Sequence, residues 1–378
     1  MGKKIRNANC LFGTRYMLTQ VEALQDEISG ALVGDDIEHV HQMRVASRRL
    51  RNGLNLFKDC LSKKQAKTWR KEIRAITKAL GNARDLDIQI DLVSRCLEAG
   101  LADRLKPGYN RLLLRLRQQR TLAQDKVDRT LVKLQEGDVL ERMEKSLKDW
   151  TAGSENLYLY TPSLYQQAFE AISGALDEFL SYQEYIHDPD NIDELHAMRI
   201  TGKHLRYTLE IFAPIYGHAL DPHIQAMKDL QDLLGDIHDN DVWIAWLPEF
   251  IEEEKARIED YFGHTGPLKR LRPGLNYFIE DRQRVRTEDY QTFLTTWETL
   301  QYENAWEVLN QIIKAPINIE AALAHQPQDR VEAPKAPQSR GEPIPLEEEP
   351  PAPQTQGLPE VSPPPDETDP DPQLDSQA

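Results

Sequence analysis

Apolar residues recur every three or four positions along most of the chain, which is the pattern of amphipathic α-helices. In the first half this periodicity predicts four helices, over residues 11–32, 36–60, 62–97 and 107–134, the last of which continues over residues 138–150. Gly81 is expected to interrupt the third of these helices, because glycine weakens a helix interior. The helical pattern stops at residues 151–154.

The same order then returns in the second half. Helices are predicted over residues 161–185, from Asp188-Pro189-Asp190 to Pro214 and Gly217, from Pro222 to Leu234, and over residues 266–313. Gly235 is expected to interrupt this half as Gly81 interrupts the first. Four helices, a break and four further helices predict an all-α fold of two four-helix bundles. The expected division is 1–156, 157–314 and a disordered tail over 315–378.

One eleven-residue segment occurs twice. The segment HQMRVASRRLR occupies residues 41–51, and HAMRITGKHLR occupies residues 196–206. The two copies agree in register at five positions that hold arginine, lysine or histidine in both: His41/His196, Arg44/Arg199, Arg48/Lys203, Arg49/His204 and Arg51/Arg206. An internal duplication is therefore the first feature that a functional account has to explain.

Each copy, placed on a helix at about 100° per residue, separates its basic and apolar residues. His41, Arg44, Arg48 and Arg51 fall within an arc of about 80°, opposite Met43, Leu50, Leu54 and Phe57. His196, Arg199, Lys203 and Arg206 do the same opposite Met198, Leu205, Leu209 and Phe212. The pattern predicts two helices that each have one core face and one cationic face.

The charge distribution favours a binding role for these faces over that of an ordinary solvated surface. Residues 1–150 hold 30 Lys and Arg against 20 Asp and Glu, whereas residues 151–325 hold 13 against 30. The second copy keeps its basic positions within that acidic segment. The overall net charge of −16 would argue against a polyanionic partner, but 12 acids against 3 bases in residues 326–378 supply much of it.

The duplication extends beyond the two segments. Alignment of Gly81 with Gly235 sets Arg74 on Lys228 and Arg84 on His238, and alignment of Gly108 with Gly274 sets Arg120 on Arg286. Further arginines follow in the last long helix of each half, at Arg111, Arg115 and Arg282. A surface salt bridge is the ordinary role of any one of them, but their joint recurrence predicts a shared basic groove.

The paired signature H-x-x-R-[VI]-x-x-[RK]-[RH]-L-R resembles that of the conserved-histidine α-helical domain, the CHAD family. The stretches LGNARDLD at 80–87 and LQDLLGDIHD at 230–239 extend the resemblance, which covers about residues 10–314. It implies an all-helical, pseudo-two-fold protein that binds inorganic polyphosphate along a basic central groove. On this basis the expected polyphosphate-binding residues are His41, Arg44, Arg48, Arg49, Arg51, Arg74, Arg84, Arg111, Arg115, Arg120, His196, Arg199, Lys203, His204, Arg206, Lys228, His238, Arg282 and Arg286.

The residue types suit a linear phosphate polymer. Ten residues of helix span about 15 Å, and arginine forks bond phosphate oxygens in pairs. Binding is expected to weaken steeply with salt because it releases counterions. His41 and His196 are expected to donate when protonated, so affinity should rise as pH falls. The second half, with His204 and His238 in place of arginines, is expected to bind more weakly or only at lower pH.

Two other functions remain open at this point. A general polyanion or nucleic-acid binder would use the same faces, with nucleic acid expected only as a weak competitor because few aromatics accompany them. A phosphate-handling enzyme, either a metal-dependent hydrolase or a phosphohistidine relay, would need clustered metal ligands or a phosphoacceptor context. We expect no catalytic residues, no metal and no cofactor. Expected partners are polyphosphate, polyphosphate-metabolising enzymes or granule proteins.

The remaining features concern compartment and tail. Three cysteines without a C-x-x-C spacing argue against a disulfide framework or a thiolate zinc site and predict a reducing cytoplasm, at polyphosphate granules. The sequence contains no apolar stretch long enough to predict a signal peptide or a membrane span. The tail over 326–378 holds 14 of 23 prolines, and we expect it to be disordered. A further hypothesis is that this acidic tail competes with the polyanion.

Overall fold

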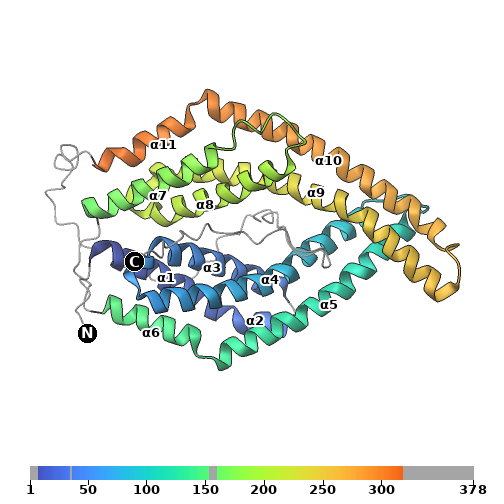
Figure 1. Cartoon of the computed structure of the whole chain (residues 1–378), viewed down its shortest axis with the longest axis horizontal. Coiled ribbons are helices and arrows are strands. Elements are labelled where there is room, and N and C mark those ends of the chain that lie inside the picture. The colour runs from blue at the N-terminus through green and yellow to red at the C-terminus, as the bar shows by residue number, and fades with distance from the viewer. Residues whose placement is uncertain (1–6, 35, 153–159, 318–378) are drawn as a thin grey trace, which may run out of the picture.

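The chain folds into helices throughout the part that the computed structural model describes, residues 7–34, 36–152 and 160–317 (Figure 1). These ranges contain no β-strand, so the predicted all-α class is confirmed. The first half consists of α1 (Ala8–Asp26), α2 (Ile28–Val33), α3 (Ile37–Leu56), η1 (Lys58–Cys60), α4 (Lys63–Glu98), α5 (Lys106–Glu136) and α6 (Val139–Thr151). The second half consists of α7 (Pro162–Leu180), α8 (Ile192–Tyr216), η2 (Gly217–Leu220), α9 (Asp221–Phe262), α10 (Leu268–Tyr302), α11 (Ala305–Lys314) and η3 (Ala315–Ile317).

Local sequence signals start several of these helices. The Asp36 carboxylate caps α3 by accepting from the backbone N–H of Glu38. Ser62 and Gln65 form a reciprocal capping box at the start of α4. Thr161 caps α7, whose first residue is Pro162, where the missing N–H costs no hydrogen bond. Side-chain caps therefore fix where three helices of the fold begin.

The two halves lie side by side, and three helix pairs make the most extensive described contacts between them (Figure 1). Near the ends of the chain's first elements α1 contacts α7, and in the centre α3 contacts α8. At the far side α5 packs against α10. The two copies of the repeated signature are on α3 and α8, so the fold brings the duplicated segments together at the junction between the halves.

The expected interruptions at Gly81 and Gly235 are wrong. Both glycines are buried inside single continuous helices, α4 and α9. The side chain of Arg44 packs on Gly81, where a Cβ would lie 3.6 Å from Arg44 Nε. Packing against neighbouring helices therefore outweighs the modest helix-weakening effect of glycine.

Other boundaries differ from the predicted ranges. The first predicted helix divides at Glu27 into α1 and α2, and the last divides at Asn304, whose backbone has a positive φ of 53°. The helix expected to reach residue 185 ends at Leu180, and α8 continues past Pro214 to Tyr216. Apart from Ala315–Ile317, which form η3, the predicted disordered tail lies outside the described residues.

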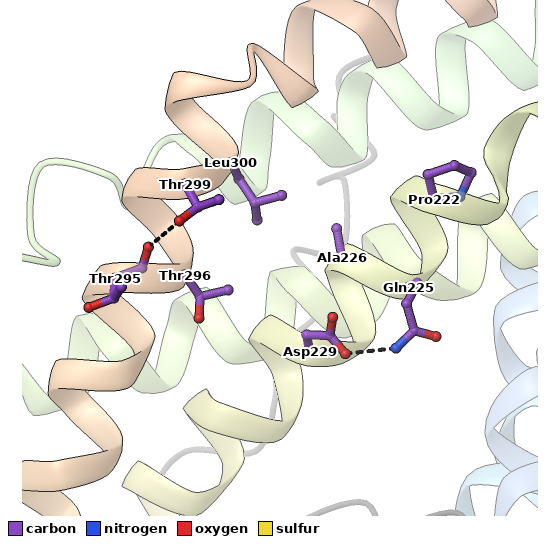
Figure 2. A pocket seen from close by; sticks show the side chains of 8 residues that line it. All are labelled: Pro222, Gln225, Ala226, Asp229, Thr295, Thr296, Thr299 and Leu300. Carbon is purple, nitrogen blue, oxygen red and sulfur yellow. Dashed lines mark hydrogen bonds between the residues drawn. The ribbon is translucent and has the colours of Figure 1, made fainter.

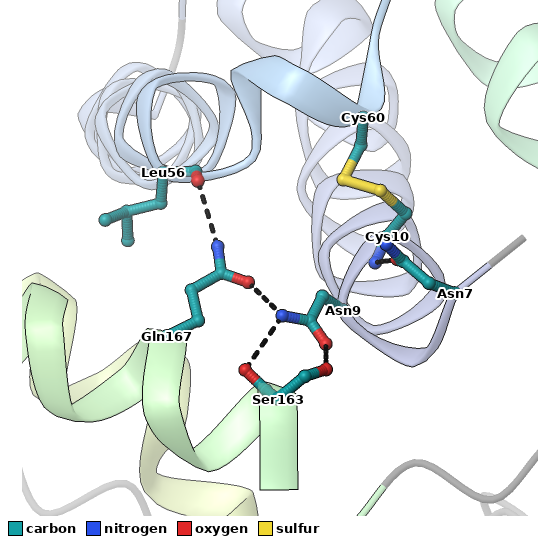
Figure 3. Close-up of a disulfide and its surroundings, with 7 residues drawn as sticks. All are labelled: Asn7, Asn9, Cys10, Leu56, Cys60, Ser163 and Gln167. Atoms are coloured by element: carbon teal, nitrogen blue, oxygen red, sulfur yellow. Dashed lines mark hydrogen bonds between the residues drawn. A yellow bond between two sulfur atoms is a disulfide. The ribbon is translucent and has the colours of Figure 1, made fainter. Parts of the chain in front are cut away.

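The prediction that the cysteines form no disulfide is also wrong. Cys10 at the start of α1 is bonded to Cys60 at the end of η1, with 5.2 Å between the two Cα atoms (Figure 3). Fifty residues separate these cysteines, so no local spacing signals the pair. The packing of α1 against α3 and η1 brings them together. Cys96 remains a free thiol.

A polar contact between the halves lies next to this disulfide. Asn9 on α1 donates to the Ser163 carbonyl at 3.0 Å and to the Gln167 side-chain oxygen at 2.8 Å, both on α7. Gln167 in turn donates to the carbonyl of Leu56 at 3.2 Å (Figure 3). These bonds fix the start of the second half onto the ends of α1 and α3.

Among the described helices, none is long and apolar enough to cross a membrane.

Candidate functional site

The apolar faces of the signature helices are buried as the pattern predicted. Met43, Leu50 and Leu54 on α3 have no exposed surface. Met198, Leu205 and Leu209 on α8 are equally buried. Because the apolar face of each helix is buried in its own half, the basic face on the opposite side is oriented toward the junction between the halves.

The basic faces of the two helices are not ordinary surface. Arg44 is 3% exposed and Arg199 is 1% exposed, whereas Arg48 and Lys203 are half-buried. Burial, with the charge of Arg48 next and that of Arg199 contributing, lowers the pKa of Arg44. The guanidinium remains charged at neutral pH because the ordinary pKa of an arginine side chain lies far above neutral pH. Cations from both repeats are therefore close enough to repel one another at the junction.

A buried carboxyl group lies among these cations. Asp85 on α4 is 1% exposed, and its Oδ1 is 3.6 Å from Arg44 Nη2. Burial raises the pKa of Asp85 to about 7, while the nearby charge of Arg44 lowers it and that of Asp239 raises it. Neither carboxyl oxygen of Asp85, and neither Nε nor Nη1 of Arg44, has a hydrogen-bond partner among the described residues. Both groups therefore retain hydrogen-bonding capacity.

The equivalent region of the second half contains two histidines. His196 Nδ1 lies 2.9 Å from His238 Nδ1, and the ring centroids are 4.0 Å apart. Burial, followed by the charges of Arg199, His196 and Lys203, strongly lowers the pKa of His238. In the first half the corresponding residue is Arg84, which is 7% exposed. The two halves therefore present different donors at this position, a fixed cation and a neutral imidazole.

One edge of the cluster holds a carboxylate shared between the halves. Arg49 on α3 is 3.2 Å from Glu210 on α8, and Arg206 is 3.4 Å from the other oxygen of Glu210. The guanidinium of Arg206 also lies 5.2 Å from the ring centroid of Tyr207. Two signature arginines are thus partly neutralised by an acid within the protein.

Arg120 and Arg286 form matching ion pairs in the two halves. Arg120 donates to Asp87 at 2.6 Å, and Arg286 donates to Asp241. Arg286 also donates to the carbonyl of Pro189 at 2.7 Å. The internal alignment of the sequence had paired these two arginines. Their partners, Asp87 and Asp241, are also equivalent when Gly81 is aligned with Gly235. Their contacts hold α5 to α4 and α10 to α9.

The remaining predicted arginines of α5 and α10 are also occupied by acids. Arg111 and Arg115 bind Glu254 of α9, at 2.8 Å and 2.6 Å, and the Glu254 side chain has no exposed surface. Arg282 donates to Asp281 and, at 3.3 Å, to Asn240. These guanidinium groups are directed at protein carboxylates and amides rather than at the signature helices.

The other predicted residues differ in exposure. His204 lies 3.8 Å from Glu178, Arg74 is exposed on α4, and Lys228 is half-buried on α9. His41 and Arg51 are half-buried on α3. Sequence reasoning missed the acids of the cluster, Asp85 and Asp239. The signal was present, because both occupy the same position in the stretches that follow the two signatures.

Two surface hollows lie apart from the signature residues. One, of about 410 Å³, opens between α9 and α10 and is lined by Pro222, Gln225, Ala226, Asp229, Thr295, Thr296, Thr299 and Leu300 (Figure 2). Its polar groups bond within their own helices: Gln225 donates to Asp229, and Thr299 donates to the Thr295 carbonyl. The other, of about 300 Å³, is lined by Ser29, Gly30, Val33, Asp36 and His39. In the described ranges no cluster of His, Cys, Asp and Glu could hold a metal ion.

The sequence model of the CHAD domain matches residues 15–248. Two uncharacterized Mycobacterium tuberculosis proteins, MT2285 and Rv2226, are each 28% identical over 226 residues, which are 56% of this chain and 40% of theirs. The chain therefore spans well under half the length of these relatives. The crystal structure of the CHAD domain from the plant Ricinus communis has a TM-score of 0.54 and 21% identity, covering 78% of this chain and 93% of that domain. PptA from Streptomyces chartreusis, at 16% identity over 75% of this chain and 99% of its own, has a TM-score of 0.46.

Proposed function

The chain belongs to the CHAD domain family, and from this membership we propose that it binds inorganic polyphosphate without altering the polymer. The observation that carries the proposal is the buried arginine pair, Arg44 and Arg199, on two facing helices that repeat the same signature. A cation in a protein interior is costly unless an opposite charge compensates it. A polyanion at the junction would supply that charge.

The internal acids compensate the cluster only in part. Arg44, Arg48 and Lys203 all act on Asp85, whose own pKa of about 7 leaves it partly protonated at neutral pH. Among the groups whose charges act on Arg44 and Asp85, the basic side chains Arg48, Arg199 and Lys203 outnumber the further carboxyl group, Asp239. Arg44 also retains two nitrogens without a hydrogen-bond partner among the described residues. Phosphate oxygens are suited to such nitrogens because guanidinium groups bond them in a planar fork.

The burial pattern divides the predicted residues into two groups. The proposed direct donors surround the junction: His41, Arg44, Arg48, Arg51, Arg84, His196, Arg199, Lys203 and His238. The proposed supporting residues are those bound to protein acids or lying at the edge: Arg49, Arg74, Arg111, Arg115, Arg120, His204, Arg206, Lys228, Arg282 and Arg286. Association with polyphosphate granules or with polyphosphate-metabolising enzymes is part of the same proposal.

Single-stranded nucleic acid is the second candidate ligand. The observation in its favour is Tyr207, which lies beside Arg206 at the edge of the cluster. Aromatic and guanidinium planes are the platforms on which unpaired bases stack. Cations far outnumber the aromatic residues described at this edge, which favours a ligand without bases, so we rank nucleic acid below polyphosphate.

A competition titration separates the two ligands. Medium-chain polyphosphate and single-stranded DNA of equal charge would compete for the wild type and for an Arg44→Ala/Arg199→Ala variant at several salt concentrations. We expect wild type to prefer polyphosphate, and the variant to lose that preference while remaining folded by circular dichroism. Equal competition by DNA would support the second candidate. Unchanged binding by the variant would contradict the site.

A further inference from the structure

The N-terminal part of α4 carries a continuous stripe of cations outside the signature. At about 100° per residue, seven side chains fall within an arc of about 120°: Lys63, Lys64, Lys67, Arg70, Lys71, Arg74 and Lys78. All except Arg70, which is half-buried, are exposed. Lys67, Lys71 and Lys78 make no ion pair with an acid among the described residues. These three lysines therefore carry positive charge that no acid among the described residues pairs with.

The stripe leads along the same helix face into the signature cluster. Gly81 and Asp85 follow Lys78 on this face, at positions where α4 has become buried. Gly81 packs against Arg44, and Asp85 lies 3.6 Å from it. The charge of Lys203 from the second half also acts on Asp85. One face of α4 thus runs from open surface directly to the centre of the site.

The corresponding face of α9 has no such stripe. The seven equivalent positions, found by aligning Gly81 with Gly235, hold Gly217, His218, Asp221, Ile224, Gln225, Lys228 and Asp232. The seven cations of the first half are therefore matched in the second half by one lysine, one histidine, two aspartates and three uncharged residues. The two halves share the signature but differ in the charge of the surface that leads away from it.

We propose that a polyphosphate chain longer than the central site leaves it in one direction, along the Lys63–Lys78 stripe of α4. This inference rests on the proposed function. It adds a second subsite, which lies on one side of the central site only and so gives the bound polymer a direction. The stripe is about 22 Å long from Lys63 to Lys78 and suits a linear polyanion. Exposed lysines hold phosphates as point charges that exchange readily, so the subsite adds affinity for long chains without enclosing them.

The test measures the binding of a short and a long polyphosphate to a variant in which three lysines of the stripe are neutralised. Lys67→Gln/Lys71→Gln/Lys78→Gln alters three exposed residues that form no ion pair with a described acid. The short polyphosphate would span no more than the ~15 Å of one signature helix, and the long one several times that length. For the long chain we expect the variant to bind about tenfold more weakly at low salt, with a shallower salt dependence. Affinity for the short chain should stay within twofold of wild type.

The matched control removes three cations from the outer helix α5. Lys126→Gln/Arg129→Gln/Lys133→Gln changes the net charge equally, and all three residues are exposed. This control should bind both chains as wild type does. A long-chain affinity equally reduced in the control, or unchanged in the α4 variant, would overturn the subsite. Failure of wild type to bind either chain would instead overturn the proposed function, so the two failures are distinguishable.

Discussion

Gly108 on α5 and Gly274 on α10 pack directly against each other where the two halves meet. A Cβ atom on Gly108 would lie 2.9 Å from the Gly274 Cα and 2.5 Å from the carbonyl oxygen of Leu271. The internal alignment had already paired these two glycines, so the contact joins equivalent points of the repeat. Only residues without a side chain allow the two backbones to approach this closely.

Replacement of Gly274 by alanine is expected to destabilise the fold. Its Cβ would lie 2.1 Å from the Leu105 carbonyl oxygen, and backbone cannot move aside as a flexible side chain can. We expect Gly274→Ala to lower the free energy of unfolding by about 1–3 kcal/mol in urea titrations. The control is Gly174→Ala in α7, where a Cβ meets nothing within 4 Å and the helix should gain up to about 1 kcal/mol. Equal stability of the two variants would contradict the close contact.

Glu254 is expected to contribute strongly to the packing of α5 on α9. Its fully buried carboxylate binds Arg111 and Arg115 and also, at 2.8 Å, Arg257. Glu254→Gln removes the charge that three guanidinium groups share, and we expect a loss of about 3 kcal/mol in the free energy of unfolding. Glu253→Gln, a neighbour with a 45% exposed side chain that also pairs with Arg257, should cost less than about 1 kcal/mol. Similar losses in both variants would contradict a special role for Glu254.

The same carboxylate predicts an acid limit to stability. Burial raises the pKa of Glu254, but the hydrogen bonds from Arg115 and Arg257 outweigh it and hold the pKa below its usual range. A carboxyl group with a lowered pKa in the folded state stabilises the protein above its unfolded pKa, and this contribution is lost as pH falls through the folded value. Wild type should therefore lose stability below about pH 4 more steeply than Glu254→Gln. Parallel pH profiles for the two proteins would count against this assignment.

The Cys10–Cys60 disulfide is expected to stabilise the first half. It closes a loop with a sequence separation of 50 residues, and removing such a loop constraint typically costs about 2–4 kcal/mol. Thermal or urea unfolding with and without dithiothreitol measures this contribution directly. Cys10→Ser/Cys60→Ser should match the reduced wild type, whereas Cys96→Ser should keep the full response to reductant. A wild type insensitive to reductant would show that the bond contributes nothing.

The fold was largely readable from the sequence, because helix periodicity and the duplicated signature are local patterns. Periodicity predicted the long helices except for the part of α9 beyond Leu234, and the alignment paired Arg120 with Arg286, which bind equivalent aspartates. Gly81 misled because intrinsic propensity is a weak signal beside burial on several sides. The disulfide was missed because only tertiary packing brings together cysteines so distant in sequence.

The interior of the candidate site could not be predicted in the same way. A basic stripe opposite an apolar stripe has the same periodicity whether it faces water or another half of the molecule. The burial of Arg44 and Arg199 depends on how α3 and α8 pack, which no local pattern encodes. Asp85 and Asp239 occupy matching positions in the two repeats, which marks them as equivalent, but their place among the signature cations depends on how α4 packs on α3 and α9 packs on α8.

Asp85 is expected to make polyphosphate affinity depend on pH. Because burial raises its pKa to about 7, the carboxyl loses its proton as pH rises from about 6 to 8 and then repels the polymer beside Arg44. We expect Asp85→Asn to bind polyphosphate several-fold more tightly than wild type at pH 8 and about equally at pH 6. Asp91→Asn, which alters an exposed aspartate of α4 paired with Arg95, should follow the wild-type profile. If Asp85→Asn kept the wild-type pH profile, the pH dependence of the site would have to come from the signature histidines His41 and His196, because the buried imidazole of His238 stays neutral.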